Sequence, residues 1–216
     1  MWDDRDYLVL SKGHGVMAQY ACLHEIGWVT DEQIAGYFSD GSKLKGLSDS
    51  RVPGLEVTSG SLGHGLSVAV GLALGAKRRR TSQKIYAIIG DGESNEGAIW
   101  EALLLANQLQ LDNLLVIVDR NGFQAMGPTE DVVQLGNLVQ KLEAFGFECL
   151  SVDGHNEVSL SGAVSQLWKS ETNGPKAIVA QTIKGKGVSF MENDNSWHYT
   201  RLNSDSYAAA IAELQL

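Results

Sequence analysis

The sequence predicts an α/β fold, a parallel β-sheet with flanking helices, in a single domain that covers residues 1–216. Short apolar runs rich in β-branched residues alternate with segments of helical periodicity, which is the element order of a parallel sheet with right-handed crossovers. A length of 216 residues suits one sizeable α/β domain. A content of 44% apolar and 20% charged residues is typical of a soluble globular protein with a full core.

Four short apolar runs are predicted to be buried strands, because turn residues bound them and they are too short for helices. They are residues 84–89, 114–118, 148–152 and 177–182. Helical periodicity predicts helices at residues 64–79, 98–109, 135–145, 158–169 and 207–214, and a broken helical region at residues 7–40. Residues 41–60 and 183–203 are expected to be irregular, and a loop as long as the second is usually functional.

The net charge of −9 argues against nucleic acid or an anionic membrane as a partner, since both reward basic surfaces. The one dense basic run, residues 77–80, is interpreted as a helix C-terminus, where the macrodipole favours cations; a polyanion site is the alternative. No signal peptide and no membrane-length apolar run is evident. Cys22 and Cys149 lack metal spacing and are expected to be small core residues, so a cytoplasmic protein is the default.

Glycines flank two histidines, in Gly13-His14-Gly15 and Gly63-His64-Gly65. Because glycine lets other groups approach the backbone closely, this pattern suggests a large ligand that is contacted by main chain.

Polar, glycine-containing turns follow two of the predicted strands. The first contains Asp91 and Gly92, and the second contains Asn121 and Phe123. Ligands of open parallel sheets bind at the carboxyl ends of the strands, and neighbouring ends lie one strand spacing apart. Carboxylate, amide and carbonyl oxygens suit Mg²⁺, which completes its shell with phosphate oxygens and water. Gly92 leaves room for a diphosphate, so the pattern predicts a metal-bridged diphosphate site; a simple strand-end turn is the alternative.

The spacing from GDG to an Asn-containing turn resembles the signature of thiamine diphosphate enzymes. The flanking segments SKGHG, TSGSLGHG, GDGESNEG, VDGHN and TIKGKGVSFMEN are similar to those of transketolases, from about Tyr7 to His198. The resemblance implies the thiamine diphosphate-binding fold and the N-terminal subunit of a split transketolase. It also implies ligand contacts. For Mg²⁺ these are Asp91, Asn121 and the main-chain oxygen of Phe123, and for thiamine diphosphate they are His14, Gly60, Ser61, Leu62, Gly92, Glu93, Asn121 and His198.

The resemblance implies three catalytic candidates. Glu96 matches a carboxylate that supports the catalytic glutamate of a partner subunit, and His198 matches a histidine that contacts the cofactor and the donor sugar. His64 is expected near the cofactor without a fixed role. A structural role remains open for each histidine, and for His155 and His24 it is the favoured interpretation.

The sequence departs from the family pattern in three places. The upstream SGHPG motif has no counterpart, Gly46-Leu47-Ser48 stands where a loop histidine is expected, and Tyr199 follows His198 in place of glycine. The predicted metal site is therefore complete, whereas the sugar-binding side is depleted.

These features predict an enzyme of the transketolase type that transfers a two-carbon ketol unit from a ketose to an aldose. Half a cofactor cleft needs a separate pyrimidine-binding chain, so a heterotetramer with two copies of each chain is expected. Gly71 and Gly75, four residues apart on one helix, suit either core packing or a close helix contact in such an assembly. The alternatives are another thiamine-dependent decarboxylase or ligase subunit, or a non-catalytic cofactor-binding subunit.

Overall fold

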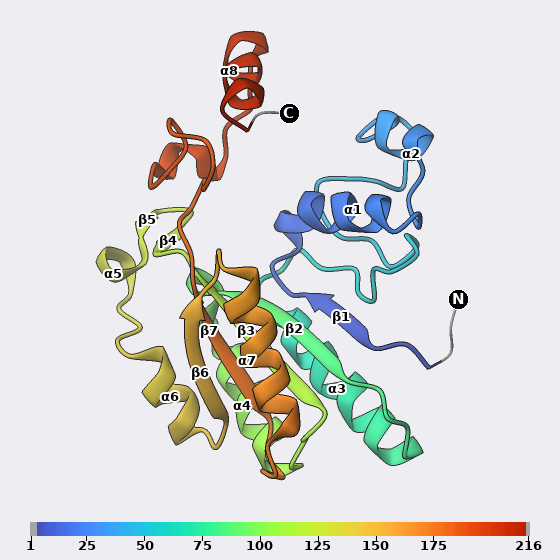
Figure 1. Ribbon diagram of the computed structural model, residues 1–216, viewed down its shortest axis with the longest axis vertical. Helices are drawn as coiled ribbons and strands as arrows, with labels where there is room; N and C mark the ends of the chain where they lie inside the picture. Colours follow the sequence, from blue (N-terminus) through green and yellow to red (C-terminus); the bar gives the residue numbers. More distant parts are fainter. Residues whose placement is uncertain (1–3, 215–216) are drawn as a thin grey trace.

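The computed structural model describes residues 4–214 and contains a five-stranded, fully parallel sheet in the order β1-β2-β3-β7-β6 (Figure 1). The central strands consist almost entirely of buried β-branched and aliphatic side chains, as expected for a sheet covered on both faces. The strands are β1 (Tyr7–Leu10), β2 (Ile85–Gly90), β3 (Leu114–Arg120), β6 (Glu148–Asp153) and β7 (Lys176–Gln181).

Helices cover the two faces of the sheet. Helices α3, α4 and α6 pack with the sheet in the larger apolar core, while α7 covers the opposite face over β3, β7 and β6 (Figure 1). Within residues 4–214, no helix is long and apolar enough to cross a membrane. The four helices that cover the sheet are α3 (His64–Arg79), α4 (Gly97–Gln108), α6 (Leu138–Ala144) and α7 (Glu157–Lys169).

Shorter elements lie beyond the carboxyl edge of the sheet. A separate apolar cluster joins α1 to the loop that follows α2. An antiparallel hairpin follows β3, and the long loop ends in a helix that extends away from the sheet (Figure 1). These elements are η1 (Gly13–Gly15), α1 (Val16–Glu25), α2 (Asp31–Ala35), η2 (Gly92–Asn95), β4 (Phe123–Gln124), β5 (Gly127–Pro128), α5 (Thr129–Val132), η3 (Asn195–His198) and α8 (Ser204–Leu214).

All four predicted strands are confirmed, but the prediction for residues 7–40 is wrong at its start. Tyr7–Leu10 is strand β1, which pairs in parallel with β2. Four residues are too few to show a period. The prediction therefore joined them to the helical pattern of the helix that begins at Val16. His14 therefore lies just after a strand, in the short helix η1, and not within a region of broken helix.

The strand register brings the predicted site together. Gly90 of β2 pairs with Asp119 of β3, and Asp119 pairs with Ala180 of β7. Asp91, Asn121 and the residues after β7 consequently leave the sheet at the same edge, as the strand-end argument predicted.

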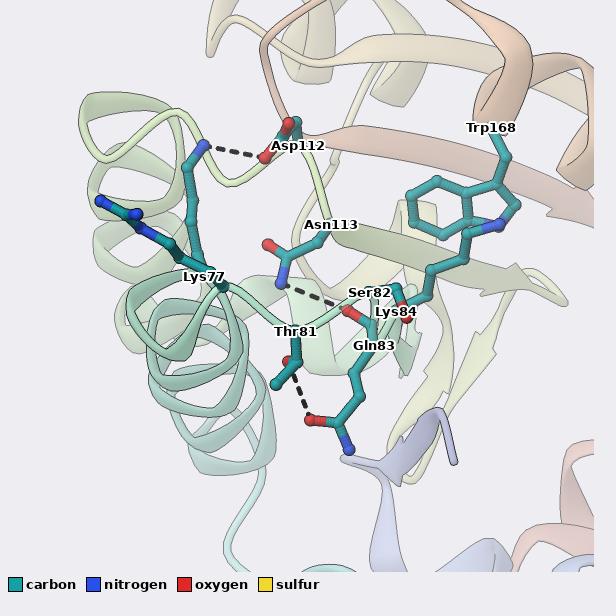
Figure 2. Close-up of a pocket in the computed structure, with 9 residues that line it drawn as sticks. Lys77, Thr81, Ser82, Gln83, Lys84, Asp112, Asn113 and Trp168 are labelled. Atoms are coloured by element: carbon teal, nitrogen blue, oxygen red, sulfur yellow. Dashed lines mark hydrogen bonds and ion pairs between the residues drawn. The ribbon is translucent and has the colours of Figure 1, made fainter. Parts of the chain in front are cut away.

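The opposite edge holds a cavity of about 320 Å³ (Figure 2). Its lining includes Lys77, Arg80, Lys84 and Trp168, and none of the predicted site residues. The basic run occupies the last turn of α3 and its C-cap, which confirms the helix-terminus interpretation. Helices α3 and α7 both end at this edge, so the cations stabilise the partial negative charge of two helix C-termini. The same partial charges would repel an anion bound there.

The cysteine prediction is wrong for Cys22, which is exposed on α1. Cys149 is half-buried on β6, and burial raises the pKa of its thiol to about 12. A thiol with so high a pKa is protonated at neutral pH and unreactive.

Candidate functional site

Asp91 and Asn121 lie side by side beyond β2 and β3. The Asp91 carboxylate is buried and accepts backbone N–H bonds from Gly92 at 2.8 Å and from Gly122 at 2.7 Å. The Asn121 side-chain oxygen accepts from the N–H of Phe123 at 3.0 Å. These bonds hold one carboxylate and one amide oxygen on adjacent turns, which is a hard-oxygen donor set suited to a small divalent cation.

Of the two carboxylates at this edge, Asp119 has an ion-pair partner and Asp91 has none among the described residues. Burial, together with repulsion from Asp119, raises the pKa of Asp91 above its ordinary value despite its two N–H bonds. The pKa of Asp119 lies below its ordinary value. Burial alone would raise it, but the charge of Lys12 and the hydrogen bonds from Lys12 and the Thr182 hydroxyl have the larger effect. Lys12 forms an ion pair with Asp119 and not with Asp91. A buried carboxylate that lacks such a partner fits a metal ligand.

Packing of the β4–β5 hairpin accounts for glycine at position 92, where the sequence suggested room for a diphosphate. A β-carbon at Gly92 would lie 2.6 Å from the β-carbon of Gln124 on β4. Gly92 is thus required by the packing of the hairpin against η2, and its contact with a diphosphate stays a prediction. The hairpin begins at Phe123, whose main-chain oxygen is the third predicted metal ligand.

Glu93 connects three segments. Its carboxylate accepts from the Ser11 hydroxyl at 2.5 Å, from the Gly63 N–H at 2.8 Å and from the Gly90 N–H at 3.1 Å. The residue is buried and both carboxylate oxygens are engaged, so its evident role is to join the end of β1 and the start of α3 to β2. The predicted cofactor contact of Glu93 remains untested by this geometry.

The two glycine-flanked histidine segments pack against protein. A β-carbon at Gly13 would lie 2.2 Å from the Ser59 hydroxyl oxygen, and one at Gly65 would lie 2.5 Å from the α-carbon of Ser11. The sequence analysis attributed these glycines to a ligand, but what comes close to both is the chain itself. Close approach of the backbone is confirmed at Gly13 and Gly65, where the neighbour is protein, and a ligand contact by the main chain of these segments stays a prediction.

His14 and His198 come together across the site. Their ring centroids are 5.6 Å apart, and Lys184 lies 3.2 Å from Nδ1 of His198. Partial burial lowers the pKa of both imidazoles, and the positive charges of Lys12 and Lys184 lower it further. Burial likewise lowers the pKa of Lys184, with Lys12 acting in the same direction. Lys12 is paired with Asp119, whereas Lys184 lies at this edge as a positive charge that an anionic ligand could meet.

The pKa values of the two histidines give a testable expectation. His14 and His198 should titrate below the ordinary value of 6.5 in an NMR pH series of the protein without ligands. The folded state then holds both rings neutral, so their contribution to stability declines as the pH falls below that value. Lys184→Gln should raise the midpoint of His198, and Lys186→Gln, on the same loop, should leave it in place. A midpoint of His198 above the ordinary value would contradict this electrostatic picture.

The remaining predicted residues surround these groups. Gly60 and Ser61 are exposed, and Leu62 is partly buried, in the turn before α3. His64 is exposed at the first position of α3, and its Nδ1 lies 3.2 Å from the oxygen of Leu62. Glu96 is exposed at the N-cap of α4, where its side chain makes no capping bond. The geometry places these residues near the site and leaves their roles as predictions.

Two histidines hold local structure. Nε2 of His155 accepts the N–H of Ile183 at 2.7 Å, which ties the β6–α7 turn to the loop after β7. Nε2 of His24 lies 2.7 Å from a carboxylate oxygen of Asp31 at the start of α2. Both contacts agree with the structural roles favoured from the sequence.

Sequence reasoning missed the cations Lys12 and Lys184 and the hydrogen bond from Thr182 to Asp119. Lys12 and Lys184 stand inside the SKGHG and TIKGKG segments, and Thr182 follows β7 directly. Applying the strand-end argument to β1 and β7 as well as to β2 and β3 would have found all three.

Comparison with known proteins identifies the fold family. The family described as "Transketolase, thiamine diphosphate binding domain" matches residues 1–215. The chain is 41% identical over 214 residues to an apulose-4-phosphate transketolase subunit of Actinobacillus succinogenes, across 98% of this chain and 76% of that protein. It is 42% identical over 215 residues to the 6-deoxy-6-sulfo-D-fructose transketolase subunit SqwG of a Clostridium strain, across 99% of this chain and 78% of that protein.

The solved structures agree with this assignment. The transketolase of Campylobacter jejuni superposes with a TM-score of 0.91 at 32% identity, over 99% of this chain and 34% of that one. The chain thus spans about three quarters of the two subunit relatives but only about one third of that transketolase. On these grounds the chain belongs to the transketolase family and carries its thiamine diphosphate-binding domain.

Proposed function

We propose that this chain binds Mg²⁺ and thiamine diphosphate as one subunit of a split transketolase, and that the assembled enzyme transfers a two-carbon ketol unit from a ketose to an aldose. The observation that carries the proposal is the strand-end donor set of Asp91 and Asn121. The rings of His14 and His198, with centroids 5.6 Å apart, lie beyond the same edge of the sheet. The two relatives described as transketolase subunits support it.

The donor set fits the metal for a chemical reason. Asp91 has a raised pKa and no cation of its own, and a bound Mg²⁺ would stabilise its charged form. Asp91, Asn121 and the main-chain oxygen of Phe123 would hold the ion, and phosphate oxygens and water would complete its shell. Lys184 and His14 would face the added negative charge of a diphosphate.

When bound, thiamine diphosphate supplies a nucleophilic carbon that the protein alone lacks. The residues of this chain would bind the cofactor and orient the substrate. The neutral imidazoles of His14 and His198 can accept or donate a proton at a sugar hydroxyl, because their pKa values lie below the neutral range. Burial and, after it, the ammonium group of Lys184, 3.2 Å from Nδ1 of His198, lower the pKa of that imidazole.

A partner subunit would cover the outer face of α3 and α4. Leu104 and Leu105 of α4 are 60% and 49% exposed, although both are large apolar residues. Gly71 and Gly75 of α3 have open space where a β-carbon would stand, so core packing within the described residues does not explain them. Glu96 begins α4 and is exposed with them. An apolar strip that ends in an exposed carboxylate fits a pyrimidine-binding subunit with a complementary face, and two copies of each chain.

Leu104→Glu is expected to abolish co-elution with the pyrimidine-binding subunit in gel filtration, because a charge in an apolar contact stays unpaired. The matched control is Val158→Glu, which changes an 81% exposed residue on the opposite face of the sheet. Co-elution that survives Leu104→Glu would place the interface elsewhere, and a native mass of one copy of each chain would contradict the heterotetramer.

The catalytic proposal is tested with the two subunits combined and hydroxypyruvate as donor. Ketol transfer to an aldehyde acceptor that depends on added Mg²⁺ and thiamine diphosphate is the expected result. Transfer should be reduced strongly by His198→Ala, whereas cofactor affinity should change much less. Cofactor binding without transfer from any ketol donor would favour a non-catalytic subunit instead.

A further inference from the structure

Leu47 is an exposed apolar residue that lies next to Gly60, one of the predicted cofactor contacts. Its side chain is 48% exposed, and one of its methyl carbons would lie 2.9 Å from a β-carbon at Gly60. Gly60 belongs to the turn whose main chain is expected to face the cofactor rings. The ring of Phe38, itself an exposed residue, packs over Gly46 on the other side. Leu47 and Phe38 thus give this loop an exposed apolar surface next to Gly60 and Gly46.

The polar groups next to Leu47 are engaged elsewhere. The Tyr20 hydroxyl donates to the main-chain oxygen of Lys45 at 3.2 Å and accepts from its N–H at 3.2 Å. The Ser48 hydroxyl donates to a main-chain oxygen at 3.0 Å and accepts from the Ser59 N–H at 3.0 Å. The Ser59 hydroxyl donates to the end of β1 at 3.2 Å. A substrate hydroxyl directed at Leu47 would therefore meet methyl groups, because the hydroxyls of Tyr20, Ser48 and Ser59 already donate to main-chain oxygens.

We propose that Leu47 determines donor specificity by turning this apolar surface toward the transferred two-carbon unit. Donors whose unit ends in a methyl group then compete with donors whose unit ends in a hydroxymethyl group. The inference rests on the proposed function, because it assigns a side of the substrate within the same site. Burying a hydroxyl without a partner costs free energy, whereas a methyl group against leucine does not.

The reaction this adds is balanced with pyruvate as donor. The bond between the carboxylate and the carbonyl carbon of pyruvate breaks, and carbon dioxide leaves. A new bond forms between that carbonyl carbon and the aldehyde carbon of the acceptor, whose oxygen takes up one proton. The products are one carbon dioxide and one α-hydroxy methyl ketone, with no oxidant or reductant.

The test compares pyruvate with hydroxypyruvate, which differ by a single hydroxyl, with glycolaldehyde as acceptor and the two subunits combined. For the unaltered protein, kcat/KM for the two donors should agree within about 100-fold, the range over which an apolar pocket discriminates an added hydroxyl. Leu47→His offers a hydrogen bond and should lower the pyruvate-to-hydroxypyruvate ratio by about tenfold or more. Leu47→Met keeps the apolar surface and should preserve the ratio.

Leu47→Asn repeats the measurement with a smaller polar group, and thiamine diphosphate affinity, followed by fluorescence, confirms that each variant keeps the cofactor site. A ratio that neither polar variant moves, or a strong preference of the unaltered protein for hydroxypyruvate, would overturn the role of Leu47 while ketol transfer stands. Transfer from neither donor, with the cofactor bound, would instead overturn the proposed function and this inference with it.

Discussion

Asp91→Asn is expected to lower the affinity for thiamine diphosphate in the presence of Mg²⁺ by more than about 100-fold, because loss of an outer partner of a metal ligand alone costs about 10- to 100-fold. Asparagine keeps the size of the side chain, and its single carbonyl oxygen can accept one of the two N–H bonds that Asp91 accepts from Gly92 and Gly122. What it removes is the negative charge. The variant therefore tests the charge and not the shape of the turn.

The same substitution should hardly change the stability of the protein without ligands. Burial and Asp119 raise the pKa of Asp91, so ionisation of this carboxyl group costs more free energy in the folded protein than in the unfolded chain. Replacing it with a neutral amide removes that cost, which offsets the lost hydrogen bond. Metal-dependent binding by the unaltered protein should strengthen as the pH rises through the pKa of Asp91, since the metal takes the ionised form.

Isothermal titration with thiamine diphosphate, with and without Mg²⁺, measures the affinity, and thermal unfolding measures stability. Asp131→Asn removes an exposed carboxylate on α5 and is the matched control, which should bind normally. An Asp91→Asn protein that binds as tightly as the unaltered one would exclude Asp91 as a ligand. One that unfolds without ligand would show instead that the carboxylate is structural.

The position of Asp91 and Asn121 at one edge of the sheet could be predicted because the information for it is local. Asp91 and Asn121 each follow directly on an apolar run, and the rule that carboxyl ends of parallel strands share one edge placed them together without any knowledge of the register. The observed pairing of Gly90 with Asp119 confirms that geometry. Strand β1 was not predicted, because four residues are too few to show a period. Without that strand, the position of Lys12 at the same edge could not be predicted either.

Roles that depend on distant contacts could not be predicted from the residues alone. Glu93 stands within the most specific motif of the chain, yet its carboxylate joins Ser11, Gly63 and Gly90, which come from three separate segments. The sequence shows that a carboxylate is present, but it does not show which residues that carboxylate will bond. The glycines beside His14 and His64 show the same limit, because the pattern indicates close approach but cannot say whether ligand or protein approaches.

That distinction leads to opposite expectations for two glycines of the same helix. Gly65→Ala should destabilise the protein by about 1–3 kcal/mol or more, as overpacking does. The new β-carbon would lie 2.5 Å from the α-carbon of Ser11, and neither backbone can rotate away as a side chain could. Any shift of Ser11 also disturbs its bond to Glu93, so cofactor affinity should fall together with stability.

Gly71→Ala is the matched comparison, since a β-carbon at Gly71 would meet nothing within 4 Å. Alanine in a helix interior should stabilise the isolated chain by about 0.5–1 kcal/mol. Thermal unfolding should accordingly move in opposite directions, by about 2–4 °C per kcal/mol for a chain of this size. If the outer face of α3 contacts the partner subunit, Gly71→Ala should also weaken co-elution with it while raising the stability of the chain alone. Equal stability of the Gly65→Ala and Gly71→Ala proteins would contradict the close packing of α3 on Ser11, because only that contact separates two otherwise identical substitutions.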